Sequence, residues 1–404
     1  MIFHSESSHK GGSSIHDRYC FAKHCWGKDV TYFVIAHFFL MIFVVIFLSI
    51  NMKGLIRISK KSAITSDAPL VSICVPARNE ERDIGACLES LLAQNYPNFE
   101  IIAVDDHSSD RTGEIIQSLA DINDRLRFIQ GQPLAKGWLG KPFALHQAQS
   151  VAKGEFLLFT DADLVFEPLA LASAVQLAQE RNADLTTLMP ATIFGSFWER
   201  CIQPVIFGFI ASLTRFEKIL DKDKHNAMGF GAFLMFKREA YDSIGGHESV
   251  RDEILEDVML AKRVKRSGLN LVVADGKEIF SIRMYHSLKE IWQGWRKNIF
   301  IALRKSVFWN IYYIFMILMF VPAPYFLMGA NIYLGGEWTL VLSFCSLLLV
   351  LATSIGLAIE LKLNPLYTLI FPLGAIMMVA IMLDSMFQVV IFKRSEWRGR
   401  VYQQ

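Results

Sequence analysis

The sequence predicts an α/β fold with a mainly parallel sheet, in a chain with long apolar segments at both ends. Between residues 68 and 300, short β-rich runs alternate with segments of helical apolar spacing, as in a parallel sheet with helical crossovers. On either side of this region lie stretches of about twenty residues with almost no charge, the length and composition of a membrane-spanning helix.

The composition of the whole chain is consistent with a multi-pass protein of the cell membrane. Of its 404 residues 52% are hydrophobic, and the formal net charge is +2. A charge so close to zero gives no electrostatic reason to expect a nucleic acid partner. The 6 cysteines are scattered, so neither a disulfide framework nor a regular metal-ligand spacing is predicted.

The N-terminal region divides into two parts. Residues 1–30 are rich in Ser and His, and we expect a disordered leader without function. Residues 31–51 contain "TYFVIAHFFLMIFVVIFLSI", which has no formal charge and begins too late for an ordinary signal peptide, so they are predicted to be a transmembrane helix. The basic residues that follow place this flank, and the domain after it, in the cytoplasm: Lys53, Arg57, Lys60 and Lys61.

Residues 68–288 form the predicted globular domain. Its first elements in order are a strand in 70–77, a helix in 78–96, a strand opening 99–110, a helix in 112–120, a helix in 141–153 and a strand in 154–163. In open sheets of this type, ligands bind beyond the carboxyl ends of the strands. Three such ends, at Pro76, Asp105 and Asp161, are therefore expected to meet at one crevice.

The stretch "TDAD" places Asp161 and Asp163 at the end of a strand that reads as buried. Two carboxylates one residue apart offer hard oxygen ligands to Mg²⁺ or Mn²⁺, which usually also binds substrate phosphates. Such a metal would neutralise a departing diphosphate. For an isolated Asp-x-Asp pair, the alternative is a turn with solvated acids. Asp105 could accept a hydrogen bond from a nucleotide base, and it is equally an ordinary residue of the turn before the next helix.

Two further places put charge at the start of a helix. Lys141 follows a glycine-flanked loop, where the backbone N–H groups of the helix favour an anionic ligand; a surface lysine on a turn is the alternative. Glu256 and Asp257 begin the helix "EDVMLAKRVKR", where acids complement the helix dipole. A functional carboxylate there would be a general base that takes the proton of an attacking hydroxyl.

The C-terminal third is predicted to lie in or on the membrane. Residues 289–306 combine Trp and Ile with Lys and Arg, which is typical of an amphipathic interfacial helix. Residues 307–392 form about three hydrophobic segments, of which one is re-entrant or interfacial if the basic tail 393–404 is cytoplasmic. Asp384 inside the last segment raises transport as an alternative to catalysis, because acids within the membrane often mark function.

The order of these motifs resembles the family 2 glycosyltransferases, which have the Rossmann-like GT-A fold. "VSICVPARNE", "VDDHSSD", "TDAD", "GGH" followed by "LEDV", and "QGWRK" occur in that order over residues 70–300. The stretches "GWLGKPFALHQA" and "WRGRVY" are similar to the membrane-bound subgroup that includes carotenoid-acid glycosyltransferases and hopanoid-associated relatives.

The resemblance implies a role for each candidate residue. The nucleotide sugar would be bound by Pro76, Arg78, Glu80, Asp105, Lys141, Asp161, Gln293 and Arg296. Asp163, with Asp161, would hold the metal, and Asp257 would be the catalytic base with Glu256 as its neighbour. Gln293 and Arg296 resemble a Q-x-x-R-W element that holds the diphosphate, but Lys297 stands where the Trp is typical. This departure argues against processive polymer synthesis.

The predicted function is an inverting transfer of a hexose, from UDP-glucose, to a hydroxyl or carboxyl of an apolar lipid such as a carotenoid acid. A lipid acceptor would explain why a catalytic fold is held at the cytoplasmic membrane face by spans on both sides. Two alternatives stay open: a polysaccharide or glycolipid synthase of the same family, and a catalytically silent membrane scaffold with this fold.

Overall fold

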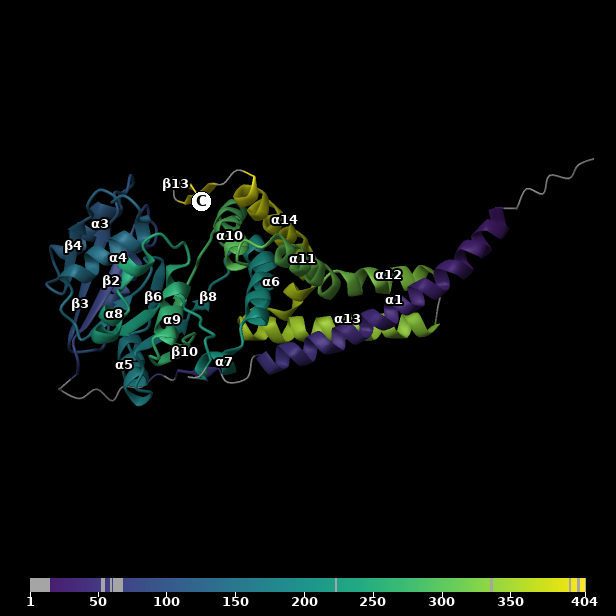
Figure 1. The fold of residues 1–404 in the computed structure, drawn as a ribbon, viewed down its shortest axis with the longest axis horizontal. Coiled ribbons are helices and arrows are strands. Elements are labelled where there is room, and N and C mark those ends of the chain that lie inside the picture. Colours follow the sequence, from purple (N-terminus) through teal and green to yellow (C-terminus); the bar gives the residue numbers. More distant parts are fainter. Residues whose placement is uncertain are drawn as a thin grey trace, which may run out of the picture.

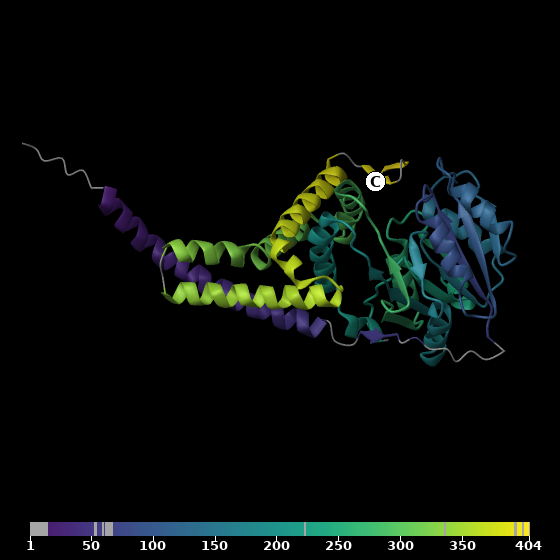
Figure 2. The ribbon, with the colours of Figure 1, turned by 180° about the vertical axis from the view of Figure 1, so that it is seen from behind.

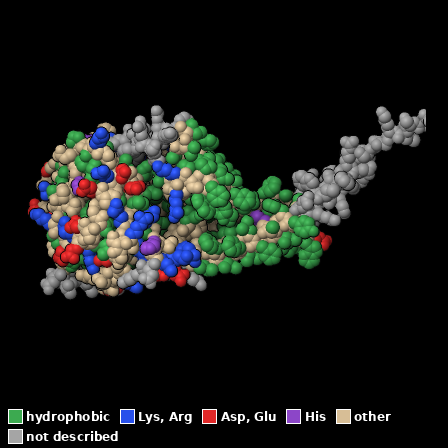
Figure 3. Space-filling view, viewed as in Figure 1, with side chains coloured by type: hydrophobic (Ala, Val, Ile, Leu, Met, Phe, Trp, Pro, Cys, Tyr) green, Lys and Arg blue, Asp and Glu red, His purple; other side chains and the backbone are tan. Residues whose placement is uncertain are grey.

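The computed structural model describes residues 15–51, 55–58, 60, 68–221, 224–334, 337–391, 394–397 and 400–403. A globular α/β domain lies at one end of an elongated molecule, and a bundle of helices extends from it (Figures 1 and 2). The two parts differ in surface: charged side chains gather on the globular domain, whereas hydrophobic ones cover the helices (Figure 3).

The globular domain is built on a mixed, mainly parallel sheet, which confirms the predicted fold class. Within the described residues this sheet has eight strands in the order β1-β10-β7-β9-β5-β2-β3-β4, with β9 antiparallel to both neighbours. A smaller sheet has the order β6-β11-β8. The strands are β1 Ile56–Arg57, β2 Val71–Ala77, β3 Phe99–Asp105, β4 Leu126–Gln130, β5 Phe156–Phe159, β6 Leu164–Phe166, β7 Leu185–Met189, β8 Ala191–Thr192, β9 Leu234–Lys237, β10 Leu271–Asp275 and β11 Phe280–Ile282.

Helices cover both faces of this sheet. They are α2 Ile84–Leu92, α3 Thr112–Ala120, α4 Gly140–Val151, α5 Ala170–Glu180, α7 Phe216–Leu220, α8 Arg238–Ser243, the 3-10 helix η1 His247–Val250 and α9 Glu256–Arg266. Because successive side chains of a strand point to opposite faces, Ile73 belongs to the core that includes side chains of α2, α3 and α5, while Cys74 belongs to the core that includes side chains of α4, α8 and α9. Burial on both faces explains why the strands read as continuous apolar runs.

The helices of the bundle come from three parts of the sequence. They are α1 Ile15–Asn51, α6 Phe197–Leu213, α10 Leu288–Ala302, α11 Val307–Phe320, α12 Ala323–Leu334, α13 Glu337–Glu360, the 3-10 helix η2 Pro365–Ile370 and α14 Phe371–Val390. α1 begins at Ile15 rather than at residue 31, so it takes in part of the segment for which we expected disorder; residues 1–14 lie outside the described residues. The expected basic tail contains a hairpin of β12 Arg394–Trp397 and β13 Arg400–Gln403.

Three helical stretches in the described residues are long and apolar enough to cross a membrane: Val30–Asn51, Glu337–Glu360 and Pro365–Val390. The uncharged stretch 307–334 is divided between α11 and α12, and each is shorter than a bilayer core requires. α10 and α11 together would make a fourth span, but they are bent by 119° at the break between them.

α6 lies within the sequence range predicted for the globular domain, yet it packs in the helical bundle. Its buried residues Cys201 and Val205 share a core with α10 and α14. At Gly374 of α14, an added Cβ would lie 1.9 Å from the carbonyl oxygen of Cys201, so only glycine permits this close approach of the two helices. α6 therefore joins the globular domain to the bundle.

Candidate active site

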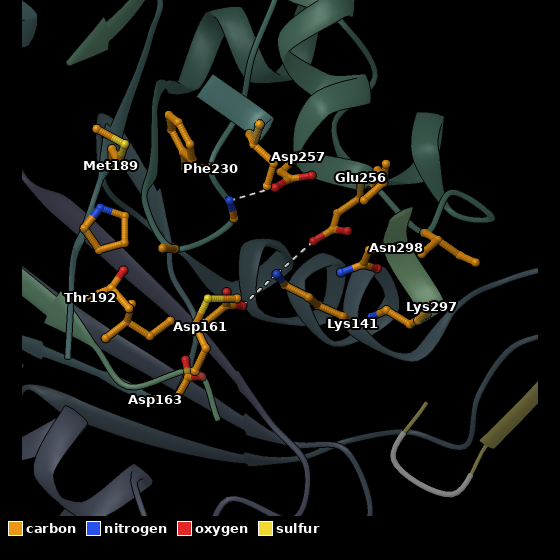
Figure 4. Close-up of a pocket in the computed structure, with 18 of the residues that line it drawn as sticks. Lys141, Asp161, Asp163, Met189, Thr192, Phe230, Glu256, Asp257, Lys297 and Asn298 are labelled. Carbon is orange, nitrogen blue, oxygen red and sulfur yellow. Dashed lines mark hydrogen bonds and ion pairs between the residues drawn. The ribbon is translucent and has the colours of Figure 1, made fainter. Parts of the chain in front are cut away.

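One pocket, of about 500 Å³, brings together the strand ends that the sequence singled out (Figure 4). It is bordered by the ends of β2, β5 and β7, by the first residues of α4 and α9, and by side chains of α6, α10 and α13. Eight of the predicted site residues line it: Pro76, Arg78, Glu80, Lys141, Asp161, Asp163, Glu256 and Asp257. Of the three strand ends expected to meet, those at Pro76 and Asp161 line this pocket, and β3 is followed there by Asp106 in place of Asp105.

Lys141 holds two carboxylates from different elements. Its Nζ lies 2.6 Å from Oδ1 of Asp161, which follows β5, and 2.9 Å from Oε1 of Glu256, which begins α9. Burial lowers the pKa of Lys141, but the charges of Asp161, Glu256 and Asp257 outweigh it and raise that pKa well above its ordinary value. Lys141 is therefore a fixed positive charge in the pocket.

Asp257 is held by backbone donors on both carboxylate oxygens. The N–H of Gly231 donates to Oδ2 at 2.8 Å, and the N–H of Val258 donates to Oδ1 at 2.8 Å. Burial and the adjacent charge of Glu256 raise the pKa of Asp257 to about 7, although Lys141 and the two backbone donors act in the opposite direction. A carboxyl that titrates near neutrality is suited to act as a general base.

The segment Gly229 to Gly231, which lies beside Asp257, was not among the site residues predicted from the sequence. A Cβ on Gly229 would lie 2.3 Å from the carbonyl oxygen of Asp257, and one on Gly231 would lie 2.9 Å from Nζ of Lys141. The signal was present in "GFG", two glycines one residue apart just before β9, because glycine often marks a close approach of the backbone.

The loop after β2 is tied to the loop after β3. Arg78 Nη1 donates to the carbonyl oxygens of Asp106 and, at 3.1 Å, of His107. The backbone N–H of Glu80 donates to Thr112 Oγ1 at 2.7 Å. These contacts join two neighbouring strand ends and hold Arg78 and Glu80 at the rim of the pocket.

Asp105 lies outside the pocket lining among the residues described, while its neighbour Asp106 is part of it. Asp105 is 4% exposed, and its carboxylate accepts from the Ser108 N–H at 3.1 Å and from Gln130 Nε2 at 3.2 Å. The bond from Ser108 is the turn contact expected as the alternative role of Asp105, and the bond from Gln130 comes from the neighbouring strand β4. Recognition of a base by Asp105 stays a prediction.

Gln293 and Arg296 also lie outside the described lining, although α10 contributes to it. The residues of α10 in the pocket are Trp295, Lys297 and Asn298. Arg296 instead lies against α14, with Nη1 3.7 Å from Oδ2 of Asp384. Successive residues of a helix are about 100° apart, so one position changes which face of α10 a side chain occupies.

Asp161 and Asp163 are the residues that could hold a metal. Within the described ranges, no group of three or more His, Cys, Asp or Glu side chains is placed to hold an ion by itself. Two carboxylates on one strand end suit Mg²⁺ or Mn²⁺ that takes its other ligands from substrate phosphates and water. The residues present therefore fit a metal that arrives with the donor.

A Rossmann-like sheet brings acidic strand ends, a lysine and a helix-borne carboxyl together in one pocket, an arrangement compatible with a glycosyltransferase of the GT-A class. Residues 72–245 match the family model described as glycosyl transferase family 2, and the domain that they form belongs to that family. Enzymes of this family transfer a sugar from a nucleotide sugar.

Curated proteins and solved structures are similar to this chain. The 4,4'-diaponeurosporenoate glycosyltransferase of Staphylococcus haemolyticus (strain JCSC1435) is 26% identical over 256 residues, 63% of this chain and 67% of that protein. The protein of the same name from Staphylococcus aureus (strain USA300) is 28% identical over 235 residues, 57% of this chain and 60% of that protein. The chain thus spans about two thirds of these relatives or less.

The mannosyltransferase PcManGT from Pyrobaculum calidifontis, solved in complex with GDP-Man and Mn²⁺, superposes with a TM-score of 0.50 at 18% identity. The match covers 90% of this chain and 99% of that one. At this level of identity, the similarity supports the fold.

Proposed function

We propose that the protein transfers a hexose from a nucleotide sugar, UDP-glucose, to the hydroxyl or carboxyl of an apolar lipid such as a carotenoid acid. The transfer inverts the configuration at the sugar and takes place at the cytoplasmic face of the membrane. The names of the curated relatives support a carotenoid-acid acceptor. The helices long enough to cross a membrane support a lipid acceptor.

The observation that carries this proposal is the position of Asp257 in the same pocket as Asp161, Asp163 and Lys141. Lys141 and the start of α4 offer positive charge to a diphosphate. Asp257, from another element, lies in the same pocket. A donor and an acceptor can therefore be held together with a base beside them, which a silent scaffold would not need.

In the proposed reaction an acceptor oxygen attacks the anomeric carbon of the hexose in a single displacement. The bond from that carbon to the donor phosphate breaks, and UDP leaves with the bonding electron pair. With a hydroxyl acceptor, Asp257 takes the proton of the hydroxyl as the new bond forms. A carboxyl acceptor is already ionised at neutral pH and has no proton to give.

Asp163 and Asp161 would hold Mg²⁺ or Mn²⁺, which would supply positive charge to the departing diphosphate. Other residues of the pocket position its carboxylates. Lys141 keeps Asp161 and Glu256 in place, and Gly231 and Val258 orient the carboxylate of Asp257 through their backbone N–H groups.

The proposal is tested by UDP release from the purified full chain in detergent. The assay contains Mg²⁺ or Mn²⁺, a panel of UDP-sugars and a total lipid extract of bacterial membranes. We expect release with one sugar, stimulated by lipid and lost in Asp163→Ala. Lack of release with every donor would overturn the proposal, and titration with UDP would then show whether the pocket binds a nucleotide at all.

A further inference from the structure

The pocket has a second, apolar part whose lining comes from the helical bundle. We call this lining the apolar wall: Phe207, Ile210 and Ala211 of α6, Trp295 of α10 and Leu357 of α13. The wall is continuous, because the rings of Phe207 and Trp295 have centroids 6.1 Å apart. A Cβ added at Gly208 would lie 3.0 Å from Cδ2 of Leu357, so α6 and α13 are in contact beside it.

The apolar wall leads directly onto a helix that can cross the membrane. Leu357 lies in the last turn of α13, one of the three candidate spans. Within one turn of it, Ile355 is 37% and Ile359 is 62% exposed, as side chains that face lipid would be. An apolar molecule lying along α13 would therefore reach the pocket at Leu357.

Charged residues mark where α13 meets the catalytic domain. Glu360, at the end of α13, forms ion pairs with Lys277 and, at 3.4 Å, with Arg57. Lys277 also lies 3.5 Å from Asp275 at the end of β10. Lys277 and Glu360 both line the pocket. With α13 as a membrane span, these charges and the pocket beside them would lie at the level of the lipid headgroups.

We propose that the apolar wall binds the hydrocarbon chain of the acceptor lipid, which enters from the bilayer along α13. The polar end of the lipid then lies in the part of the pocket that contains Asp257. Trp295 supports this arrangement, because its ring lines the pocket beside the ring of Phe207 and offers the chain an apolar surface. This inference rests on the proposed function and adds where its acceptor binds.

The binding of the chain is tested by photolabelling the full protein in detergent with a long-chain fatty acid that carries a diazirine at mid-chain. We expect mass spectrometry to find the label on residues 207–211 and around Leu357. Ala211→Trp, which fills the wall, should lower this labelling about tenfold, the effect of 1.4 kcal/mol. Ile355→Trp adds similar bulk on the outward side of α13 and should leave it unchanged.

Leu357→Gln is a second variant with less steric change, and titration with UDP checks that each variant is folded. Labelling confined to outward helix faces, or equal in wild type, Ala211→Trp and Leu357→Gln, would overturn the inference. Because the labelling needs no donor, its failure is distinct from a failure of UDP release, which would overturn the proposed function. With an active wild type, Ala211→Trp should raise the KM of a long-chain acceptor about tenfold more than that of a short-chain acid or alcohol.

Discussion

The guanidinium of Arg296 on α10 lies 3.7 Å from the carboxylate of Asp384 on α14. The same carboxylate oxygen accepts a hydrogen bond from the indole N–H of Trp292 at 2.6 Å. Ser385, the next residue of α14, donates to the carbonyl oxygen of Arg296. The one acidic residue of α14 thus joins it to α10, which gives Asp384 a structural role and removes the reason for a transport function.

Replacing Asp384 should loosen the contact between α10 and α14. Asp384→Leu leaves the Trp292 N–H and the Arg296 charge without their partner, which should cost about 1–3 kcal/mol of stability. Asp384→Asn keeps an oxygen for Trp292 and should cost less. Thermal unfolding of the full chain in one detergent measures both. Equal unfolding temperatures for wild type and Asp384→Leu would contradict this role.

Lys297, rather than Arg296, should contribute to binding of the donor. Lys297 lines the pocket, whereas Arg296 faces Asp384. Lys297→Ala should weaken UDP binding about tenfold, since a charged hydrogen bond contributes roughly 1.5 kcal/mol. Arg296→Ala is the matched variant on the neighbouring position, with an effect on UDP binding of less than about twofold. Titration calorimetry compares the UDP affinities of the two variants. A larger loss of affinity in Arg296→Ala than in Lys297→Ala would contradict this prediction and support diphosphate binding by Arg296, as the family motif implies.

Removing the charge of Lys141 should damage both stability and binding. Lys141→Met leaves Asp161 and Glu256 without the cation that lies 2.6 and 2.9 Å from them, at a cost of about 3 kcal/mol. Lys141→Arg retains the charge and should lose less stability and less affinity for the donor. The measurements are thermal unfolding and titration with a UDP-sugar. A fully stable Lys141→Met that binds the donor normally would mean that the cluster is only a surface ion pair.

The sequence predicted the polar half of the pocket because parallel strands bring their carboxyl ends to one edge of a sheet. That rule placed Pro76 and Asp161 together, although they are far apart in the chain, whereas Lys141 was a candidate because it begins a helix. The rule does not say which side chains at a strand end face outward. The carboxylate of Asp105 is bound within the turn, where it accepts from the Ser108 N–H, and its neighbour Asp106 lines the pocket.

The helical bundle was less predictable, because its contacts depend on packing rather than on periodicity. An apolar helix such as α6 has the same composition whether it covers a sheet or joins a bundle. α6 packs in the bundle, where Gly374 of α14 permits a close approach to Cys201 of α6. The orientation of α10 likewise follows from the pairing of Arg296 with Asp384, which no local motif contains.

Glu199 should stabilise the link between α6 and the smaller sheet in a pH-dependent way. Its buried carboxylate accepts from Arg283 Nη2 at 3.0 Å and from the Ser196 N–H at 2.8 Å. Burial raises the pKa of Glu199, but these hydrogen bonds outweigh it and lower that pKa to about 2. The folded-state pKa lies below the unfolded value, so the stabilisation is present above about pH 4.5 and is lost as the pH falls towards 2.

Glu199→Gln should therefore lower stability by about 2 kcal/mol at pH 7, and the difference from wild type should shrink at pH 3. Thermal unfolding at both pH values measures it. Glu199 is not part of the pocket lining described, so UDP binding serves as the control for an intact site. A difference that stays constant between pH 7 and pH 3 would show that the lost stability does not come from the charge.

The pH dependence of transfer should report the protonation of Asp257 and, with it, the kind of acceptor. The pKa of Asp257 is raised to about 7, so its basic form prevails only above neutrality. With a hydroxyl acceptor, the rate should fall about tenfold for each pH unit below 7 and level off above it.

With a carboxyl acceptor no proton must be removed, so the rate should lack this limb. Asp257→Asn should then reduce transfer far less than the 10²–10⁴-fold expected for the loss of a general base. The two profiles are measured with the full chain and one UDP-sugar, against a long-chain alcohol and a long-chain acid of equal length. A limb near pH 7 that persists in Asp257→Asn would assign the titration to another group. Glu256→Gln, which removes a charge that raises the pKa of Asp257, should move the limb to lower pH.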